Sequence, residues 1–192
     1  MLKRPSKPAL IFTVGHSTRA LDEFIALLKA HGVEQLVDVR TIPRSRHNPQ
    51  FNHDTLSTVL RNVRIGYRNM KGLGGLRHPR KDSPNMGWRN SGFRGFADYM
   101  QTTEFETNLQ KLIELAKKKQ AVIMCAEAVP WRCHRSLIAD ALTVRGIHVE
   151  HITSRTHRQS HKLTPFAQIQ GKRIFYPSEA TPDLPSLGDA LQ

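Results

Sequence analysis

A stretch of twelve residues at 125–136, CAEAVPWRCHRS, contains two cysteines, a glutamate, a histidine and two arginines. It follows the apolar run AVIM and precedes a segment whose apolar residues recur at helical spacing, which predicts a corner between a buried strand and a helix. Free backbone N–H groups and the helix dipole favour negative charge at such a corner. Because Arg132 and Arg135 could add forked donors for a phosphate or carboxylate, we interpret the stretch as an anion-binding corner.

Cys133 is the candidate reactive thiol of this corner. A thiolate near a helix N-terminus, flanked by Arg132, His134 and Arg135, is stabilised as a charge, which lowers the thiol pKa. Cys133 is therefore a candidate nucleophile or redox group, and the structural alternative is a buried, inert cysteine. A disulfide with Cys125 is the less favoured prediction, because the ionisable surroundings suit a reduced pair.

The same residues include possible metal ligands. Cys125, Cys133, His134 and His16 are candidate zinc ligands, but Cys-x7-Cys-His is not a standard zinc spacing. The neighbouring arginines would also repel a cation. The sequence alone thus assigns no metal ligand, and we expect no cofactor.

Polar signatures also follow the other predicted strands of the chain. Ligands of open parallel sheets bind beyond the carboxyl ends of the strands, so these signatures are expected to share one edge with the corner. We assign proton transfer to Glu127, His16 and Asp38, with Cys133 as a reserve nucleophile. The predicted anion- or substrate-binding residues are Gly15, Ser17, Arg40, Arg44, Gly74, Gly75, Arg132, His134 and Arg135.

Several of these residues have a structural alternative. Asp38 could hold its loop by a salt bridge to Arg40, and Glu127 could serve only to orient Arg135. Glycine pairs such as the one in LGG are common in loops that bind no ligand.

The fold class follows from apolar runs that alternate with amphipathic stretches, a rhythm typical of βαβ units. It predicts a three-layer α/β domain with a mostly parallel sheet of about five strands flanked by helices. Ser17 or Thr18 is expected to cap the first helix, which Gly32 ends. The predicted strands are 10–14, 35–39, 65–68, 121–125 and 147–152, and the predicted helices are 19–31, 53–63, 93–118 and 135–145.

The composition of the chain limits the cellular location and the binding partners that we expect. The net charge of +13 is concentrated in residues 40–94 and 151–173, which favours an anionic small molecule or nucleic acid as partner. The N-terminal apolar run is too short for a membrane span or a secretory signal, so a cytoplasmic protein with no membrane association is expected. We expect a flexible basic segment at 1–9, a single domain at 10–176 and an extended tail at 177–192.

The combined motifs resemble the DUF488 family over about residues 10–152. They are VGHST, DVR, PRSR, FN, LGG, FADYM, CAE and CHR. The resemblance implies a compact, cytoplasmic, largely bacterial protein without an assigned activity, and it points to GHS, DVR, CAE and CHR as the central cluster. The phosphatase signature is not matched, because the residue six positions after Cys125 is Trp131 and not arginine.

Three functions remain open at this point. The first is an enzyme, a hydrolase or transferase, acting on a phosphate-bearing substrate such as a nucleotide or nucleic acid. The second is a non-catalytic nucleic-acid-binding protein that uses the two basic segments. The third is a thiol-based redox or metal sensor.

Overall fold

A six-stranded sheet forms the centre of the computed structural model, which describes residues 10–178. Its strand order is β3-β2-β4-β1-β5-β6, and every neighbouring pair is parallel except β5 with β6. This confirms the expected mostly parallel sheet and adds one antiparallel edge strand. The strands are β1 (Leu10–Gly15), β2 (Gln35–Asp38), β3 (Gly66–Asn69), β4 (Ala121–Cys125), β5 (His148–Ile152) and β6 (Arg158–Ser160).

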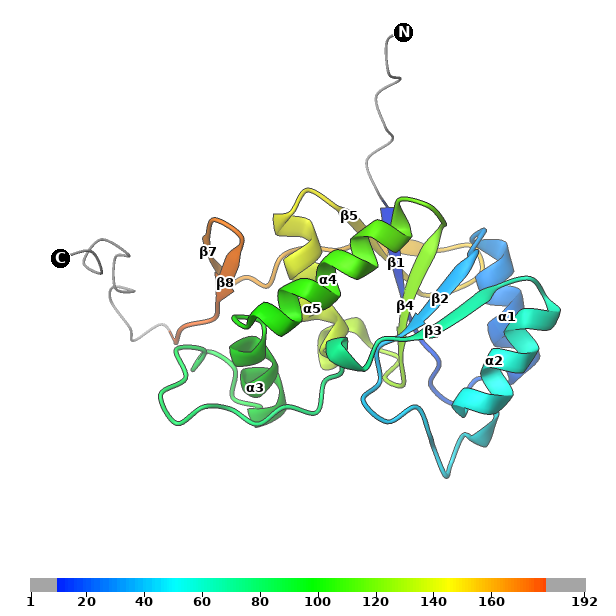
Figure 1. Cartoon of the computed structure of the whole chain (residues 1–192), viewed down its shortest axis with the longest axis horizontal. Coiled ribbons are helices and arrows are strands. Elements are labelled where there is room, and N and C mark those ends of the chain that lie inside the picture. The colour runs from blue at the N-terminus through cyan, green and yellow to red at the C-terminus, as the bar shows by residue number, and fades with distance from the viewer. Residues whose placement is uncertain (1–9, 179–192) are drawn as a thin grey trace, which may run out of the picture.

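Helices cover both faces of the sheet (Figure 1). One layer contains α1 (Leu21–Ala30) and α2 (His53–Asn62); the other contains α3 (Ser91–Tyr99), α4 (Thr103–Ala116) and α5 (Arg135–Val144). Successive strand residues point to opposite faces, so Ile11 packs with α4 and α5, whereas Phe12 packs with α1 and α2. The three-layer, single-domain α/β fold is therefore confirmed.

The predicted helix at 93–118 is wrong, because the chain forms two helices there. Thr102 caps the start of α4, its side chain accepting a hydrogen bond from the backbone N–H of Phe105 (3.2 Å). Phe96 of α3 packs edge to face against Phe105 of α4. Both helices contribute to one apolar core, which explains why their residues share a continuous helical period in the sequence.

The predicted cap of the first helix is also wrong. Helix α1 begins at Leu21 after Ala20, and no side chain caps it. Ser17 instead has a left-handed backbone (φ 51°), and its N–H donates to the carbonyl of Ala126. The loop after β1 therefore pairs with the loop after β4 before the helix starts. The predicted end of the helix is confirmed by Gly32, whose φ is +63°.

The C-terminal part of the described chain returns to the domain. Strands β7 (Gln168–Gln170) and β8 (Arg173–Phe175) form a separate antiparallel pair. Tyr176 is fully buried, and its hydroxyl donates to Asp140 (2.9 Å). The predicted segment 1–9 and residues 179–192 of the predicted tail lie outside the described residues. Within residues 10–178, no helix has the length and apolar character that a membrane crossing needs.

Candidate active site

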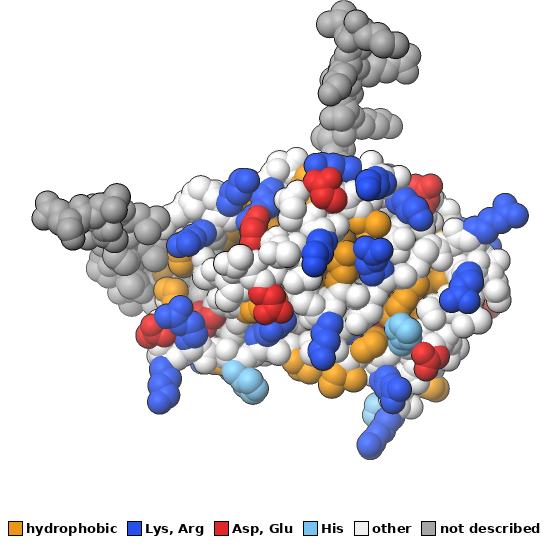
Figure 2. Space-filling model, viewed as in Figure 1, with side chains coloured by type: hydrophobic (Ala, Val, Ile, Leu, Met, Phe, Trp, Pro, Cys, Tyr) orange, Lys and Arg blue, Asp and Glu red, His pale blue; other side chains and the backbone are white. Residues whose placement is uncertain are grey.

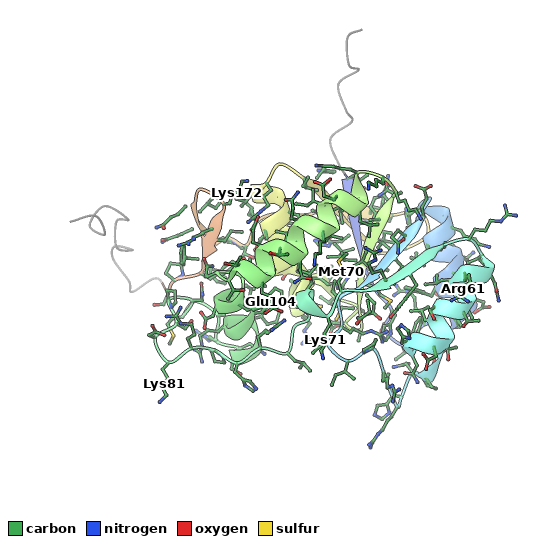
Figure 3. All side chains as sticks on the ribbon, viewed as in Figure 1. Arg61, Met70, Lys71, Lys81, Glu104 and Lys172 are labelled. Carbon is green, nitrogen blue, oxygen red and sulfur yellow. The ribbon has the colours of Figure 1, made fainter. Side chains whose placement is uncertain are left out.

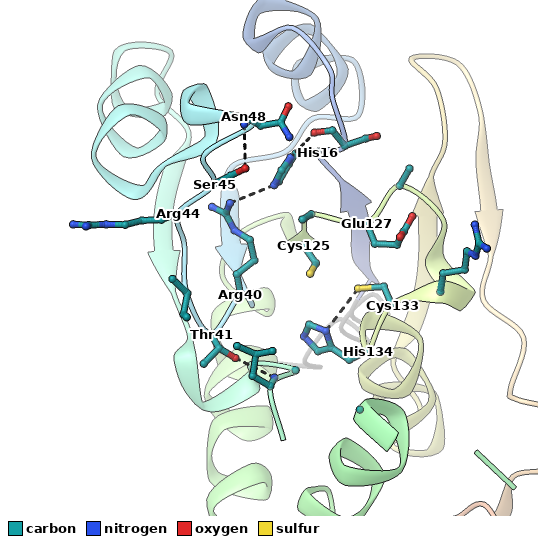
Figure 4. Close-up of a pocket in the computed structure, with 18 of the residues that line it drawn as sticks. His16, Arg40, Thr41, Arg44, Ser45, Asn48, Cys125, Glu127, Cys133 and His134 are labelled. Carbon is teal, nitrogen blue, oxygen red and sulfur yellow. Dashed lines mark hydrogen bonds between the residues drawn. The ribbon is translucent and has the colours of Figure 1, made fainter. Parts of the chain in front are cut away.

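A cavity of about 670 Å³ opens beyond the carboxyl ends of β1, β2 and β4 (Figure 4). Strands β1 and β4 are neighbours, but α1 leaves β1 on one face of the sheet and α5 leaves β4 on the other. The loops after these strands therefore diverge and leave a crevice, which is where ligands bind in open α/β sheets. The crevice is the one the motif positions predicted.

Two sulfur atoms and one imidazole nitrogen form the centre of the cavity wall. The Sγ atoms of Cys125 and Cys133 and a ring nitrogen of His134 all lie within 4.8 Å of one another. Both cysteines are free thiols. A hydrogen bond from Cys125 lowers the pKa of Cys133 well below its usual value, and His134 and Arg135 lower it further. The same hydrogen bond, together with burial, raises the pKa of Cys125. The hydrogen bond between the two sulfurs thus favours the charged form of Cys133 and the protonated form of Cys125.

The orientation of His134 is fixed by the backbone. Its Nε2 lies 3.1 Å from the carbonyl oxygen of Val39, which can only accept, so Nε2 carries the proton and donates. Its Nδ1 faces the Sγ atom of Cys133 at 3.7 Å. The imidazole can therefore share a proton with this sulfur without changing its position.

Arg135 lies behind the sulfur cluster and not in the cavity. It is 1% exposed, and its Nε donates to the Sγ atom of Cys133 (3.4 Å). Its two NH groups donate to the hydroxyl of Thr13 and the carbonyl oxygens of Glu127 and Ala128. Arg135 thus fixes the corner loop and stabilises the thiolate from inside the protein.

A buried chain of hydrogen bonds continues from Thr13 away from the cavity. The Thr13 hydroxyl lies 2.7 Å from Nδ1 of His151, and Nε2 of His151 lies 3.0 Å from Nδ1 of His161. Nε2 of His161 lies 2.8 Å from the fully buried carboxylate of Asp140. Every link can donate in the same direction, from Arg135 to Asp140, when both imidazoles are neutral. The pKa of His151 is lowered to about 4, mainly by burial and also by His161 and Arg135, so His151 is neutral at pH 7.

His16 and Arg40 form the opposite wall of the cavity. The pKa of His16 is lowered to about 4, mainly by burial and also by Arg40, although its hydrogen bond to Ser17 acts in the opposite direction. Neutral His16 donates from Nδ1 to the Ser17 carbonyl (2.8 Å) and stacks on Phe51. Its unprotonated Nε2 lies 3.3 Å from NH1 of Arg40.

Arg40 and Asp38 form a buried, two-point ion pair. Nε and NH2 of Arg40 donate to the two carboxylate oxygens of Asp38 (2.9 and 2.6 Å), and the Tyr67 hydroxyl also donates to this carboxylate (2.7 Å). NH2 of Arg40 further donates to the carbonyl of Phe51. Asp38 is fully buried and committed to these partners, so the structural alternative describes it better than proton transfer does.

Nine of the thirteen predicted site residues line the cavity. They are His16, Ser17, Arg40, Arg44, Gly75, Glu127, Arg132, Cys133 and His134. The other four predicted residues do not line the cavity and lie behind those that do; they are Gly15, Asp38, Gly74 and Arg135. Cys125 also lines the cavity, although the sequence named it only as a candidate zinc ligand and not as a catalytic or anion-binding residue. The sequence argument missed the polar side chains of Thr41, Ser45, Asn48 and Asn90.

The arginines that remain for an anion lie at the rim. Arg44 and Arg132 are exposed, and within residues 10–178 no hydrogen bond or ion pair holds either of them. Figure 4 shows Arg44 extended away from the sulfur cluster. Glu127 is exposed as well, and its Oε1 accepts from the N–H of Val129 (3.1 Å), whereas the hydrogen bond from Arg135 goes to its backbone carbonyl.

The glycines of the site allow other parts of the same chain to pack closely against them. A Cβ on Gly15 would lie 1.9 Å from the carbonyl oxygen of Glu127, and one on Gly74 would lie 2.3 Å from Oγ1 of Thr41. A Cβ on Gly75 would lie 2.5 Å from Nδ1 of His134. We predicted close approach of a ligand at these glycines, but the atoms that need the space belong to the chain itself.

Gly75→Ala is expected to displace the His134 ring and to lower the free energy of unfolding by about 1–3 kcal/mol, because the added methyl overpacks the wall. Urea unfolding measures the loss, and the NMR shifts of the imidazole report the displacement. Gly92→Ala is the matched control, because the nearest atom to its Cβ is a side-chain oxygen of Asn90 at 3.1 Å. Unchanged His134 shifts in Gly75→Ala would contradict the packing described.

Comparison with known proteins identifies a family but no relative of known activity. No curated protein matches the chain, and no solved structure matches it. A family model, described as the domain of unknown function DUF488, matches residues 20–142. This segment is more than half of the 192 residues and includes β2, α2, β3, α3, α4, β4 and the sulfur cluster. The protein therefore belongs to the DUF488 family.

Proposed function

We propose that the protein is an enzyme that acts on a phosphate-bearing substrate, a nucleotide or a nucleic acid, in the cavity beside Cys133. The observation that carries this proposal is the Cys133 sulfur in the wall of a cavity, with His134 and Arg135 beside it and two exposed arginines at the rim that no hydrogen bond or ion pair holds within residues 10–178. A buried group with a strongly perturbed pKa in a cleft is typical of a catalytic site. A cavity of about 670 Å³ has the size of sites for small molecules and cofactors.

Arg132 and Arg44 provide the cationic rim for phosphate oxygens, since their guanidinium groups are exposed and no ion pair holds them within residues 10–178. Arg40 and Arg135, predicted as parts of the same clamp, keep most of their donors for Asp38 and for the corner loop. Cys133 supplies the reactive centre. A thiolate can serve either as a nucleophile or as a metal ligand, and the enzyme requires Cys133 in both cases.

The alternative function is non-catalytic binding of nucleic acid along a basic surface. Figure 2 shows Lys and Arg side chains dispersed among Asp and Glu on the face that it draws. Arg61, Lys81 and Lys172 are exposed and point away from the domain at separate places (Figure 3). On the face that Figure 2 draws, this dispersion supports binding in the cavity more than binding along a continuous basic stripe.

Turnover of nucleotides and short oligonucleotides tests the proposal. We expect Cys133→Ser to reduce kcat/KM by at least about 100-fold, as loss of a central catalytic group does. Arg132→Ala is expected to raise KM about tenfold with little change in kcat, since it removes about 1.4 kcal/mol of substrate binding. Arg61→Ala, an exposed arginine on α2, is the control.

Equal KM values for Arg132→Ala and Arg61→Ala would contradict the assignment of Arg132 to the substrate-binding site. Binding of DNA or RNA that depends steeply on salt and survives Cys133→Ser without any turnover would support the non-catalytic alternative instead.

A further inference from the structure

The sulfur cluster has the donor set of a metal site as well as that of a reactive thiol. Cys125, Cys133 and His134 each offer one donor atom, and these atoms lie within 4.8 Å of one another. Two thiolates around one Zn²⁺ ion, with Zn–S bonds of about 2.3 Å in tetrahedral geometry, lie about 3.8 Å apart. The three donors therefore need to move by at most about one ångström to share an ion.

His134 is held in the orientation that a metal ion requires. Its Nε2–H donates to the carbonyl of Val39, so Nδ1, which faces Cys133, is the nitrogen left for a metal ion. A ligating histidine in proteins typically donates its other ring nitrogen to a carbonyl or carboxylate in this way. Gly75 has no side chain beside Nδ1, and any Cβ there would lie 2.5 Å from this atom.

Cys133 is also held by a hydrogen bond from a residue that would not itself bind the metal ion. Nε of Arg135 donates to its Sγ atom at 3.4 Å, and Arg135 is in turn held by Thr13 and the corner carbonyls. Hydrogen-bond donors that contact a metal ligand but not the metal ion orient that ligand and tune the charge on a metal-bound sulfur. The sequence argument that arginines would repel a cation loses its force here, because one divalent ion with two thiolates has no net charge.

The cluster also explains how a phosphate could approach the sulfurs. A phosphate-bearing substrate beside a bare thiolate would meet like-charge repulsion at short range. A divalent cation between the sulfurs removes this repulsion and offers an open position, since three protein ligands leave a tetrahedral site one ligand short. The cavity gives that position access to substrate or water.

We propose that Cys125, Cys133 and His134 form a three-ligand site for a soft divalent metal ion, Zn²⁺ by the choice of ligands, with its fourth position open to the cavity. Two sulfurs and one imidazole suit zinc and disfavour Mg²⁺ or Ca²⁺, which prefer oxygen ligands. Bound there, the ion would act as a Lewis acid toward a phosphate oxygen or a water molecule. Its use in catalysis rests on the proposed function, whereas its binding does not.

The test is a titration of fully reduced, chelator-treated full-length protein with Co²⁺ alone. We expect one Co²⁺ per chain, with an intense thiolate-to-cobalt absorption band and the visible bands of tetrahedral coordination, and displacement of both by one equivalent of Zn²⁺. Cys125→Ser, Cys133→Ser and His134→Gln should each weaken binding at least about 100-fold. His78→Gln, an exposed histidine, should bind like the unmodified protein.

Circular dichroism and urea unfolding of each variant separate loss of a ligand from loss of the fold. The proposal is wrong if the reduced protein, with two titratable thiols per chain, gives no thiolate-to-cobalt band. It is equally wrong if Cys125→Ser binds Co²⁺ as tightly as the unmodified chain, because the site then lacks its second sulfur.

The metal titration and the turnover assay can fail independently. Metal binding at the cluster without turnover of any phosphate-bearing substrate would support the metal site and contradict the proposed function. Turnover that requires Cys133 in metal-free protein, with no Co²⁺ binding, would do the reverse and assign the thiolate as the nucleophile.

Discussion

Replacing Arg135 by methionine is expected to lower the free energy of unfolding by about 3–5 kcal/mol, because each buried acceptor left unsatisfied costs about 1–3 kcal/mol. The acceptors that lose their donor are the carbonyls of Glu127 and Ala128, the Thr13 hydroxyl and the Cys133 sulfur. For a domain of this size the melting temperature should fall by about 10 °C. Arg135→Lys should recover only part of the loss, since an ammonium cannot reproduce the guanidinium fork.

Arg132→Met is the matched control for this prediction. Arg132 lies three residues earlier in the same corner but is exposed, and within residues 10–178 no hydrogen bond or ion pair holds it. Its replacement should change stability by no more than about 0.5 kcal/mol, as is usual at exposed positions. Thermal and urea unfolding of the pair give the comparison. Equal stability of the two variants would contradict the supporting role assigned to Arg135.

Acidification between pH 6.5 and 4 is expected to destabilise the folded protein through His16 and His151. The pKa of each falls from 6.5 to about 4 on folding, with burial as the main cause. Below pH 6.5 the unfolded chain binds protons that the folded chain excludes, so stability is full above pH 6.5 and is lost as the pH falls toward 4. The difference between 6.5 and 4 corresponds to about 3 kcal/mol for each histidine.

Urea unfolding at a series of pH values measures this loss. His151→Asn should be less stable than the unmodified protein at pH 7, yet the gap should narrow by about 3 kcal/mol toward pH 4, because one titrating group is gone. His78→Asn, at an exposed position, should leave the slope unchanged. Parallel curves for His151→Asn and the unmodified protein would show that His151 does not exclude a proton when folded.

The local pattern of the sequence was sufficient to predict the sheet and the place of the site. Apolar runs of four to six residues separated by amphipathic stretches specify parallel strands with crossover helices, and this rhythm located β1 to β5 within about two residues. The rule that loops at carboxyl strand ends converge then placed His16, Cys133 and Arg132 in one cavity. The break between α3 and α4 was missed, because a shared core face keeps the helical period across Thr102.

The sequence by itself thus determined the fold class, the family and the edge of the sheet where polar residues meet. Only the tertiary structure decided which of those residues face the cavity and which support it from behind. Arg135 and Arg132 belong to the same motif, but Arg135 is buried against carbonyls of its own corner and Arg132 is exposed at the rim. The reason is physical: charge and spacing are properties of the chain, whereas desolvation and hydrogen-bond partners depend on what packs against each side chain.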